Sequence, residues 1–161
     1  LDKAEALLDE SGWVDSNNDG IRDKEIDGRT VPFEFSILVN QQPLRIAICT
    51  LLKENLDQIG IRLNVRPVES TVLQDLTLNR KFQAYLGGWG SGTDPDTSEN
   101  LWKTGAMRNF CNYSNPEVDR LYAEGRQEFD KGKRAEKYGQ IQEILYDDQP
   151  YTWLYLSLIH I

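Results

Sequence analysis

FEFSILV (residues 33–39), PLRIAICTLLKENLDQIG (43–60) and IRLNV (61–65) together decide the fold. The first segment places apolar side chains at every second position, which predicts a β-strand. Pro43 opens the second segment, whose apolar residues recur at helical spacing up to a terminal glycine. The third segment alternates again, and we expect Pro67 to close this strand. Strand, helix and strand in this order predict a βαβ unit with a right-handed crossover.

The flanking sequence continues the alternation of helices and strands. On the N-terminal side, Ala4, Leu7 and Leu8 have helical spacing, and a turn is expected at Asp27-Gly28. On the C-terminal side, the patterns predict helices at 71–80, 97–103, 115–129 and 131–147 and strands at 82–86 and 151–159. In the last helix, Asp130 and Arg134 are spaced to pair across one turn. The pattern predicts an α/β fold with a mixed, mainly parallel sheet flanked by helices.

Composition excludes several classes of partner. The chain of 161 residues carries a formal net charge of −8, which argues against nucleic acid and against an anionic membrane surface. No apolar run approaches the roughly 20 residues that span a bilayer. Residues 1–10 carry acids and no apolar core of a signal peptide, and the first residue is not Met, so we interpret the sequence as a fragment.

The cysteines and the single histidine give little support to a zinc site. Cys49 falls in the apolar pattern of the predicted helix, which favours a buried thiol, and a Cys49–Cys111 bridge is the alternative. Zinc sites need several Cys or His ligands at suitable spacing, and His160 is the only histidine.

An acidic loop lies at residues 15–20. Asp15, Asn17 and Asp19 alternate ahead of a glycine, as in the first half of a calcium-binding loop, with Ile21 offering a carbonyl and Asp23 a carboxylate. The acid that such a loop needs at its twelfth position is missing. A polar turn, in which Asn and Asp side chains bind the backbone, is the other interpretation.

A glycine-rich run, GGWGSGTDPD (residues 87–96), follows the predicted strand at 82–86. Ligands of open α/β sheets bind beyond the carboxyl ends of strands, and glycines let another backbone approach closely. The run lacks the lysine of a phosphate-binding loop. Nor is there a G-x-S-x-G motif, and nothing separates the roles of Asp94 and Asp96 as acid and base, so we expect no enzyme.

Four segments in order resemble one family. They are residues 4–20, residues 82–96, Asn-Tyr-Ser-Asn-Pro-Glu-Val-Asp at 112–119, and residues 130–150. The chain is similar to the extracellular solute-binding proteins of the oligopeptide, dipeptide and nickel type. This resemblance implies a periplasmic-binding-protein-like (type II) lobe at residues 1–155, in a two-lobed protein about three times as long. Residues 156–161 depart from the family and resemble a translated sequencing adapter, so we expect a non-native tail.

The resemblance also implies a ligand site. In the family, backbone groups of the matching segment, here Gly88, Trp89 and Gly90, pair with a peptide ligand as an added strand. Peptide-binding relatives carry an aspartate shortly after this tryptophan that pairs with the ligand's α-ammonium. Here residues 91–93 occupy that stretch, and Asp94 is the candidate for this role. A modified peptide, a sugar or another small solute stays open as the ligand.

The partners implied by the resemblance are a peptide-like solute, the permease of an ABC importer and the missing N-terminal lobe. We expect a periplasmic or extracellular protein, anchored through a lipid at an N-terminus outside this sequence, with no cofactor unless calcium occupies the acidic loop. The alternatives are a receptor for sugars or metal chelates within the same family, and a sensory ligand-binding module.

Overall fold

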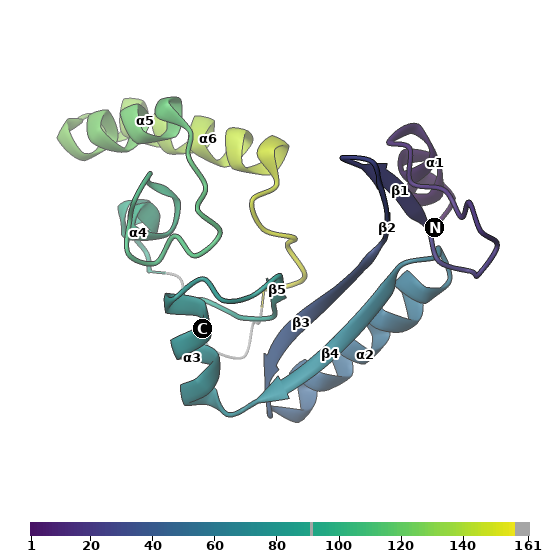
Figure 1. The fold of residues 1–161 in the computed structure, drawn as a ribbon. Helices are drawn as coiled ribbons and strands as arrows, with labels where there is room; N and C mark the ends of the chain where they lie inside the picture. Colours follow the sequence, from purple (N-terminus) through teal and green to yellow (C-terminus); the bar gives the residue numbers. More distant parts are fainter. Residues whose placement is uncertain (91, 157–161) are drawn as a thin grey trace. The chain divides into compact units, whose positions relative to one another are not determined.

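The computed structural model describes residues 1–90 and 92–156, and the chain divides into two compact units. Unit 1 comprises Leu1–Gly88 and unit 2 comprises Trp89–Ile161. Each unit is described by itself (Figure 1). The assignment of residues 1–155 to one lobe stays a prediction, and the expected non-native tail lies outside the described residues except for Leu156.

Unit 1 contains the predicted βαβ unit. Its sheet has the strand order β4-β3-β5, and β3 pairs in parallel with both neighbours. Helix α2 follows the strands along their length (Figure 1). The α/β class is therefore confirmed. The elements are β3 (Glu34–Asn40), α2 (Pro43–Asp57), β4 (Arg62–Val68), α3 (Ser70–Leu78) and β5 (Ala84–Tyr85).

Alternation along β3 builds the core of unit 1. Ile37 and Val39 pack with Cys49 of α2 and Leu63 of β4, while Leu38, only 2% exposed, is buried on the opposite face of the strand. Burial raises the pKa of the Cys49 thiol, as expected for a thiolate that would lose its hydration. Both cysteines are free, which confirms the buried thiol for Cys49 and excludes the bridge.

Pro67 does not close β4, contrary to the expectation. The strand continues to Val68, and Pro67 lies opposite Val39 in the register. The reason is topological, because β4 is an edge strand and a proline there costs no ladder hydrogen bond on its open side.

The N-terminal part of unit 1 contains a hairpin that the sequence analysis gave only as a turn. Helix α1 (Asp2–Glu10) precedes β1 (Asp23–Ile26) and β2 (Arg29–Pro32), which pair antiparallel. Asp27 and Gly28 connect them with φ of 50° and 73°. Positive φ at both positions is typical of the tight turns that join antiparallel strands.

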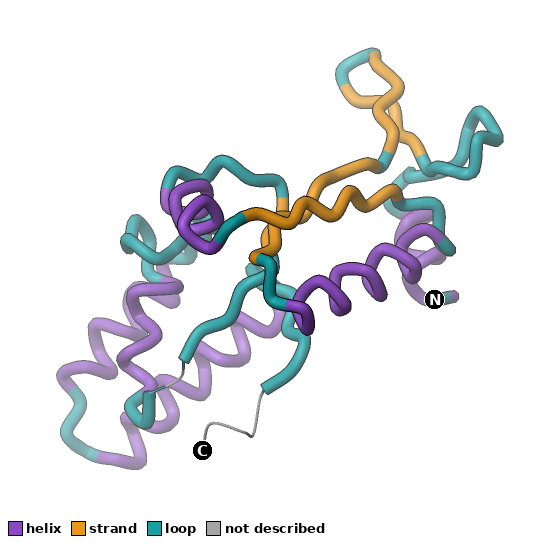
Figure 2. Tube along the Cα trace, turned by 90° about the horizontal axis from the view of Figure 1, so that it is seen from below, coloured by secondary structure: helices purple, strands orange, loops and turns teal. Residues whose placement is uncertain are grey.

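Unit 2 is built on a pair of long helices. Helices α5 and α6 lie side by side in both views (Figures 1 and 2). Asn115 caps α5 by accepting from the N–H of Glu117, and Asp130 caps α6 by accepting from the N–H of Lys133. The elements are the 3-10 helix η1 (Pro95–Ser98), α4 (Glu99–Trp102), α5 (Pro116–Gln127) and α6 (Lys131–Asp148).

The core of unit 2 lies between these helices and α4. Its buried residues are Trp102, Val118, Leu121, Tyr122, Tyr138, Ile141 and Leu145. Gly125 of α5 packs against the ring of Tyr138, whose atoms would lie 3.0 Å from an added Cβ. A side chain at this position would require the Tyr138 ring to shift.

Two expectations for unit 2 are wrong. The helix expected at 115–129 ends at Gln127, and Phe129 beyond it is 98% exposed. Residues 151–156 form no strand, since Tyr151 and Trp153 pack instead against the ring of Trp102. Among the described residues, no helix is both long enough and apolar enough to cross a membrane.

Candidate functional site

Among the described residues, the backbone of Gly88, Trp89 and Gly90 has no backbone hydrogen-bond partner. The last bond toward the sheet is donated by the Leu86 N–H to the Leu38 carbonyl at 2.8 Å. Beyond it, within the described part of the chain, no backbone group of residues 87–90 is hydrogen-bonded to another backbone group. Unpaired backbone N–H and C=O groups are what an extended peptide needs to add itself as a strand.

The glycines around Trp89 keep this backbone accessible. A Cβ on Gly87 would lie 2.6 Å from the ring of Tyr85, so no side chain fits there. At Gly90 a Cβ would meet no described atom within 4 Å. A Cβ on Gly88 would lie 3.5 Å from a guanidinium nitrogen of Arg45, which is ordinary contact. Gly87 is thus restricted by packing against Tyr85, Gly88 has room for a Cβ in ordinary contact, and Gly90 leaves open space among the described atoms.

Trp89 is 38% exposed, so it is not part of a buried core. Its ring lies 5.6 Å from the ring of Phe110, at an interplanar angle of 40°. The guanidinium carbon of Arg108 lies 5.8 Å from its ring centroid, within the range of a cation–π contact.

Asn109 fixes the loop that carries these two neighbours. It is 1% exposed, and its side-chain amide donates to the carbonyls of Lys103 and Tyr113 at 3.0 and 2.7 Å. Its side-chain oxygen accepts from the Tyr113 N–H at 2.9 Å. A buried amide satisfied in this way holds the backbone on either side of it. Arg108 and Phe110 are therefore presented to Trp89 by a tethered loop.

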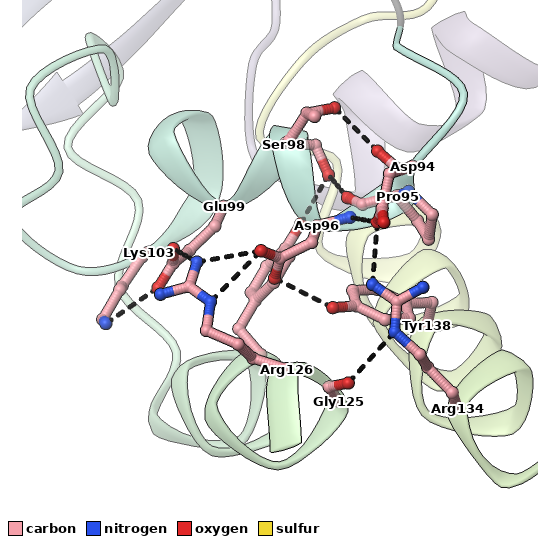
Figure 3. A network of polar contacts seen from close by, with 12 residues as sticks. Asp94, Pro95, Asp96, Ser98, Glu99, Lys103, Gly125, Arg126, Arg134 and Tyr138 are labelled. Atoms are coloured by element: carbon pink, nitrogen blue, oxygen red, sulfur yellow. Dashed lines mark hydrogen bonds and ion pairs between the residues drawn. The ribbon is translucent and has the colours of Figure 1, made fainter. Parts of the chain in front are cut away.

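Asp94 lies at the edge of a polar network that ties the segment after Trp89 to the helix pair (Figure 3). Its Oδ1 accepts from Nη2 of Arg134 at 2.8 Å and from the N–H of Asp96 at 2.9 Å. Nε of Arg134 donates to the Gly125 carbonyl at 3.2 Å. The Asp94 side chain is 54% exposed, and its second oxygen has no hydrogen-bond partner among the described residues.

Asp96 and Glu99 form the inner part of this network. Oδ2 of Asp96 accepts from Nε and Nη2 of Arg126 at 3.1 and 3.0 Å, and its Oδ1 accepts from the Tyr138 hydroxyl at 2.9 Å (Figure 3). Glu99 is bound by Arg126 and by Lys103. Each acid of η1 and α4 is thus matched by a cation, which suits a structural tie better than catalysis.

The electrostatics of the network follow from these pairs. Hydrogen bonding from Arg134, and then from the Asp96 N–H, holds the pKa of Asp94 below its usual value. Lys103 lowers the pKa of Glu99 in the same way, with Arg126 adding to the effect. Burial, followed by the hydrogen bond to Asp96, raises the pKa of Tyr138 to about 12. Asp94 and Glu99 are therefore ionised, and Tyr138 is a protonated donor, at neutral pH.

Arg134 was expected to pair with Asp130, and that expectation is wrong. The carboxylate of Asp130 accepts from the N–H of Lys133 at 3.0 Å, as the cap of α6. Capping occupies Asp130 at the helix start, which leaves the Arg134 guanidinium to reach Asp94.

The acidic loop forms the hydrogen bonds of a polar turn. The two side-chain oxygens of Asp15 accept from the N–H groups of Asp19 and Gly20, and Asp19 accepts from the Ile21 N–H. Asp23 is 5% exposed, and its carboxylate accepts from Ser16. No group of three or more His, Cys, Asp or Glu suited to a metal occurs among the described residues. Calcium binding by Asp15, Asn17, Asp19, Ile21 and Asp23 stays a prediction, which thermal unfolding with and without calcium would test.

Sequence reasoning missed the residues that surround Trp89 and Asp94. Arg108, Phe110 and Arg126 lie 19 to 37 positions after Trp89, and no periodicity connects them to it. Only the acid-rich DPD segment (94–96) gave a signal, because closely spaced carboxylates require cations nearby.

The fold and this site define a class, the solute-binding proteins. Residues 1–110 match the family described as bacterial extracellular solute-binding proteins, family 5, middle region. The chain belongs to this family. It is 34% identical to the oligopeptide-binding protein AppA of Bacillus subtilis over 98% of this chain.

Solved structures agree with this assignment. The structure of AppA from Bacillus subtilis with a nonapeptide superposes with a TM-score of 0.86 over 96% of this chain and 31% of that chain. The structure of an oligopeptide-binding protein from Thermus thermophilus with a pentapeptide is 27% identical in sequence. It superposes with a TM-score of 0.82 over 93% of this chain and 28% of that chain. A periplasmic oligopeptide-binding protein of an ABC transporter from Thermotoga maritima, solved with mannohexaose, is 25% identical in sequence. It superposes with a TM-score of 0.80 over 92% of this chain and 29% of that chain. The chain spans 29% of the length of AppA.

Proposed function

We propose that this chain is part of the substrate-binding component of an ABC importer and captures peptide-like solutes. The observation that carries the proposal is the segment from Gly88 to Gly90. Its backbone groups are unpaired within the described residues, and Trp89 beside them is partly exposed. Backbone pairing does not depend on ligand side chains, which suits a receptor for many peptides.

The relatives support a peptide as the ligand. AppA of Bacillus subtilis and the Thermus thermophilus protein have been solved with a nonapeptide and a pentapeptide. The position of Asp94 favours a peptide ligand with a free amino terminus. The second oxygen of Asp94 is open to an ammonium group, and Arg134 keeps the carboxylate ionised. In this proposal Gly88, Trp89 and Gly90 bind the ligand backbone and Asp94 binds its terminus.

Native mass spectrometry of the complete gene product, purified without refolding, tests the proposal. A spread of co-purified peptide masses is the expected result. A single non-peptide mass would overturn the peptide assignment and retain a solute-binding protein. Extraction of the bound material with acid, followed by sequencing of the peptides, would then show whether their amino termini are free.

A carbohydrate is the second candidate ligand. Its support is the mannohexaose-bound relative from Thermotoga maritima. An exposed indole such as Trp89 also suits stacking against a sugar ring, since its flat apolar face matches the C–H face of a pyranose. Titration calorimetry with a mannohexaose and with a pentapeptide separates the two candidates.

We propose three further features of the complete protein. The remaining share of the relatives' length suggests that a second lobe completes the cleft and closes over the ligand. The partner is the permease of the importer, and the location is the periplasm or the outer face of the cell membrane. Co-purification with the permease and detection of a lipid-modified cysteine in the complete gene product test these features.

A further inference from the structure

We infer that Arg108 is a specificity-determining residue that selects ligands with a carboxylate close to the segment bound at Trp89. This inference rests on the proposed peptide-binding function and adds the ligand's charge to it. Its starting point is that Arg108 differs from every other arginine of unit 2.

Arg120, Arg126 and Arg134 are each bound to one or more carboxylates of their own unit. The side chain of Arg108 has no hydrogen-bond or ion-pair partner among the described residues, although its backbone carbonyl accepts from the Phe110 N–H at 2.9 Å. The absence of a partner is informative because the chain holds 26 acids against 18 lysines and arginines. In such an acidic chain, an arginine without a carboxylate leaves its five N–H donors to water or to a ligand.

The backbone at Arg108 is anchored by its neighbour Asn109, although the Arg108 side chain lies at the surface. Asn109 anchors the loop through its three hydrogen bonds to Lys103 and Tyr113. Trp89 then orients the guanidinium through the contact at 5.8 Å, and Phe110 supports the indole at 5.6 Å. A guanidinium that stacks on an aromatic ring keeps its N–H groups in its own plane, free to bind a carboxylate with two parallel hydrogen bonds.

The ligand chemistry follows from this arrangement. A peptide laid along residues 89 and 90 would pass the guanidinium of Arg108, and a carboxylate is the group of a peptide that matches its fork. That carboxylate has two sources, an Asp or Glu side chain and the free C-terminus of the ligand. Both present the same planar anion, so the test must separate them.

The test uses the complete gene product and an alanine pentapeptide series. One arm replaces each position in turn by Glu or by Gln in peptides with an amidated C-terminus. The other arm compares the free and the amidated C-terminus of the peptide without Glu. We expect the wild type to prefer the carboxylate member of one matched pair about fivefold in Kd, the range of a partly exposed ion pair.

Three variants test whether Arg108 causes that preference. Arg108→Gln should reduce the ratio of Kd values to about one, while Arg108→Lys should retain part of it because the charge remains. Arg29→Gln is the matched control, since Arg29 is an exposed arginine of unit 1 whose loss changes the net charge equally. It should leave the ratio unchanged.

The outcomes separate this inference from the proposed function. Tight binding with equal Kd values for every matched pair would overturn the role of Arg108 and leave the peptide receptor intact. A preference that survives in Arg108→Gln would do the same. Failure of the wild type to bind any member of the series would overturn the peptide-binding function, and with it the role of Arg108.

Discussion

Nη2 of Arg134 lies 2.8 Å from Oδ1 of Asp94, forty positions earlier in the sequence. The pair joins helix α6 to the start of the 3-10 helix η1, in the segment that leads away from Trp89. It ties the segment that begins at Asp94 to a residue far along the chain.

The first prediction concerns the acid of this pair. The pKa of Asp94 is lowered in the folded state, so its contribution to stability is present above the unfolded pKa of about 3.9 and is lost as the pH falls through the lower folded value. Asp94→Asn should therefore make the melting temperature less dependent on pH below about 4. Thermal unfolding followed by circular dichroism across this range checks the result.

A double-mutant cycle supplies the control for that prediction. Asp94→Asn and Arg134→Gln should each lower the melting temperature, and the double variant should lower it by less than the sum of the two. Additive effects would show that the two side chains contribute independently, contrary to the contact.

The second prediction concerns Trp89. Trp89→Ala should weaken binding of the ligand by about 1–3 kcal/mol, because truncating an aromatic anchor removes both its contact area and its rigidity. Titration calorimetry with a pentapeptide measures the change. Phe129→Ala is the control, since that ring is 98% exposed and contributes to neither core. Equal affinity of wild type and Trp89→Ala would remove Trp89 from the site.

The third prediction concerns the free oxygen of Asp94. If it binds the ligand's α-ammonium, Asp94→Asn should weaken the binding of a peptide with a free amino terminus and leave its acetylated form unaffected. Competition between the two peptides measures this difference. A wild-type protein that binds both forms equally would contradict the role.

The fourth prediction concerns alkaline pH. Burial raises the pKa of Tyr122 and of Tyr138 to about 12, above the ordinary value of about 10. Their contribution to stability is fully present below the unfolded value of about 10 and is lost as the pH rises through about 12. The absorbance of tyrosinate should show a late-titrating component that shrinks in Tyr138→Phe. An unchanged titration curve would contradict the shift.

The fifth prediction concerns the packing of unit 2. Leu121 is 1% exposed between α5 and its neighbours, so Leu121→Ala should lower the free energy of unfolding by about 2–5 kcal/mol. Denaturant unfolding measures the loss. Leu44→Ala is the comparison, because Leu44 is 57% exposed and its replacement should change the free energy of unfolding little.

The fold was predictable where a local pattern dictates it. Alternation in β3 and β4 and the apolar stripe of α2 are periodic signals, and the structure confirms the βαβ unit that they predict. The predicted end of β4 was wrong because a proline such as Pro67 is tolerated within an edge strand. No local pattern reveals that β4 lies at the edge of the sheet. The helix predicted at 115–129 was two residues too long at its C-terminal end, because α5 ends at Gln127.

The surroundings of the candidate site were less predictable. Gly88, Trp89 and Gly90 were found through the glycine run and the family resemblance, and their binding role stays a prediction. Arg108 and Phe110 meet Trp89 only because the Asn109 amide folds their loop. Such contacts between distant segments follow from tertiary packing, so a single sequence gives no periodic sign of them.

The network of Asp94, Asp96 and Glu99 also sets an order of events during synthesis. Their cations Arg126 and Arg134 come later in the chain, and Arg134 follows Asp94 by forty residues. At about 5–20 residues per second, the ribosome needs about 2–8 s to cover that interval. During the first part of this time the three carboxylates lack their full set of cations, because of these cations only Lys103, four residues after Glu99, has been made. The ion pair between Asp94 and Arg134 therefore cannot form until the first turn of α6 has been synthesised.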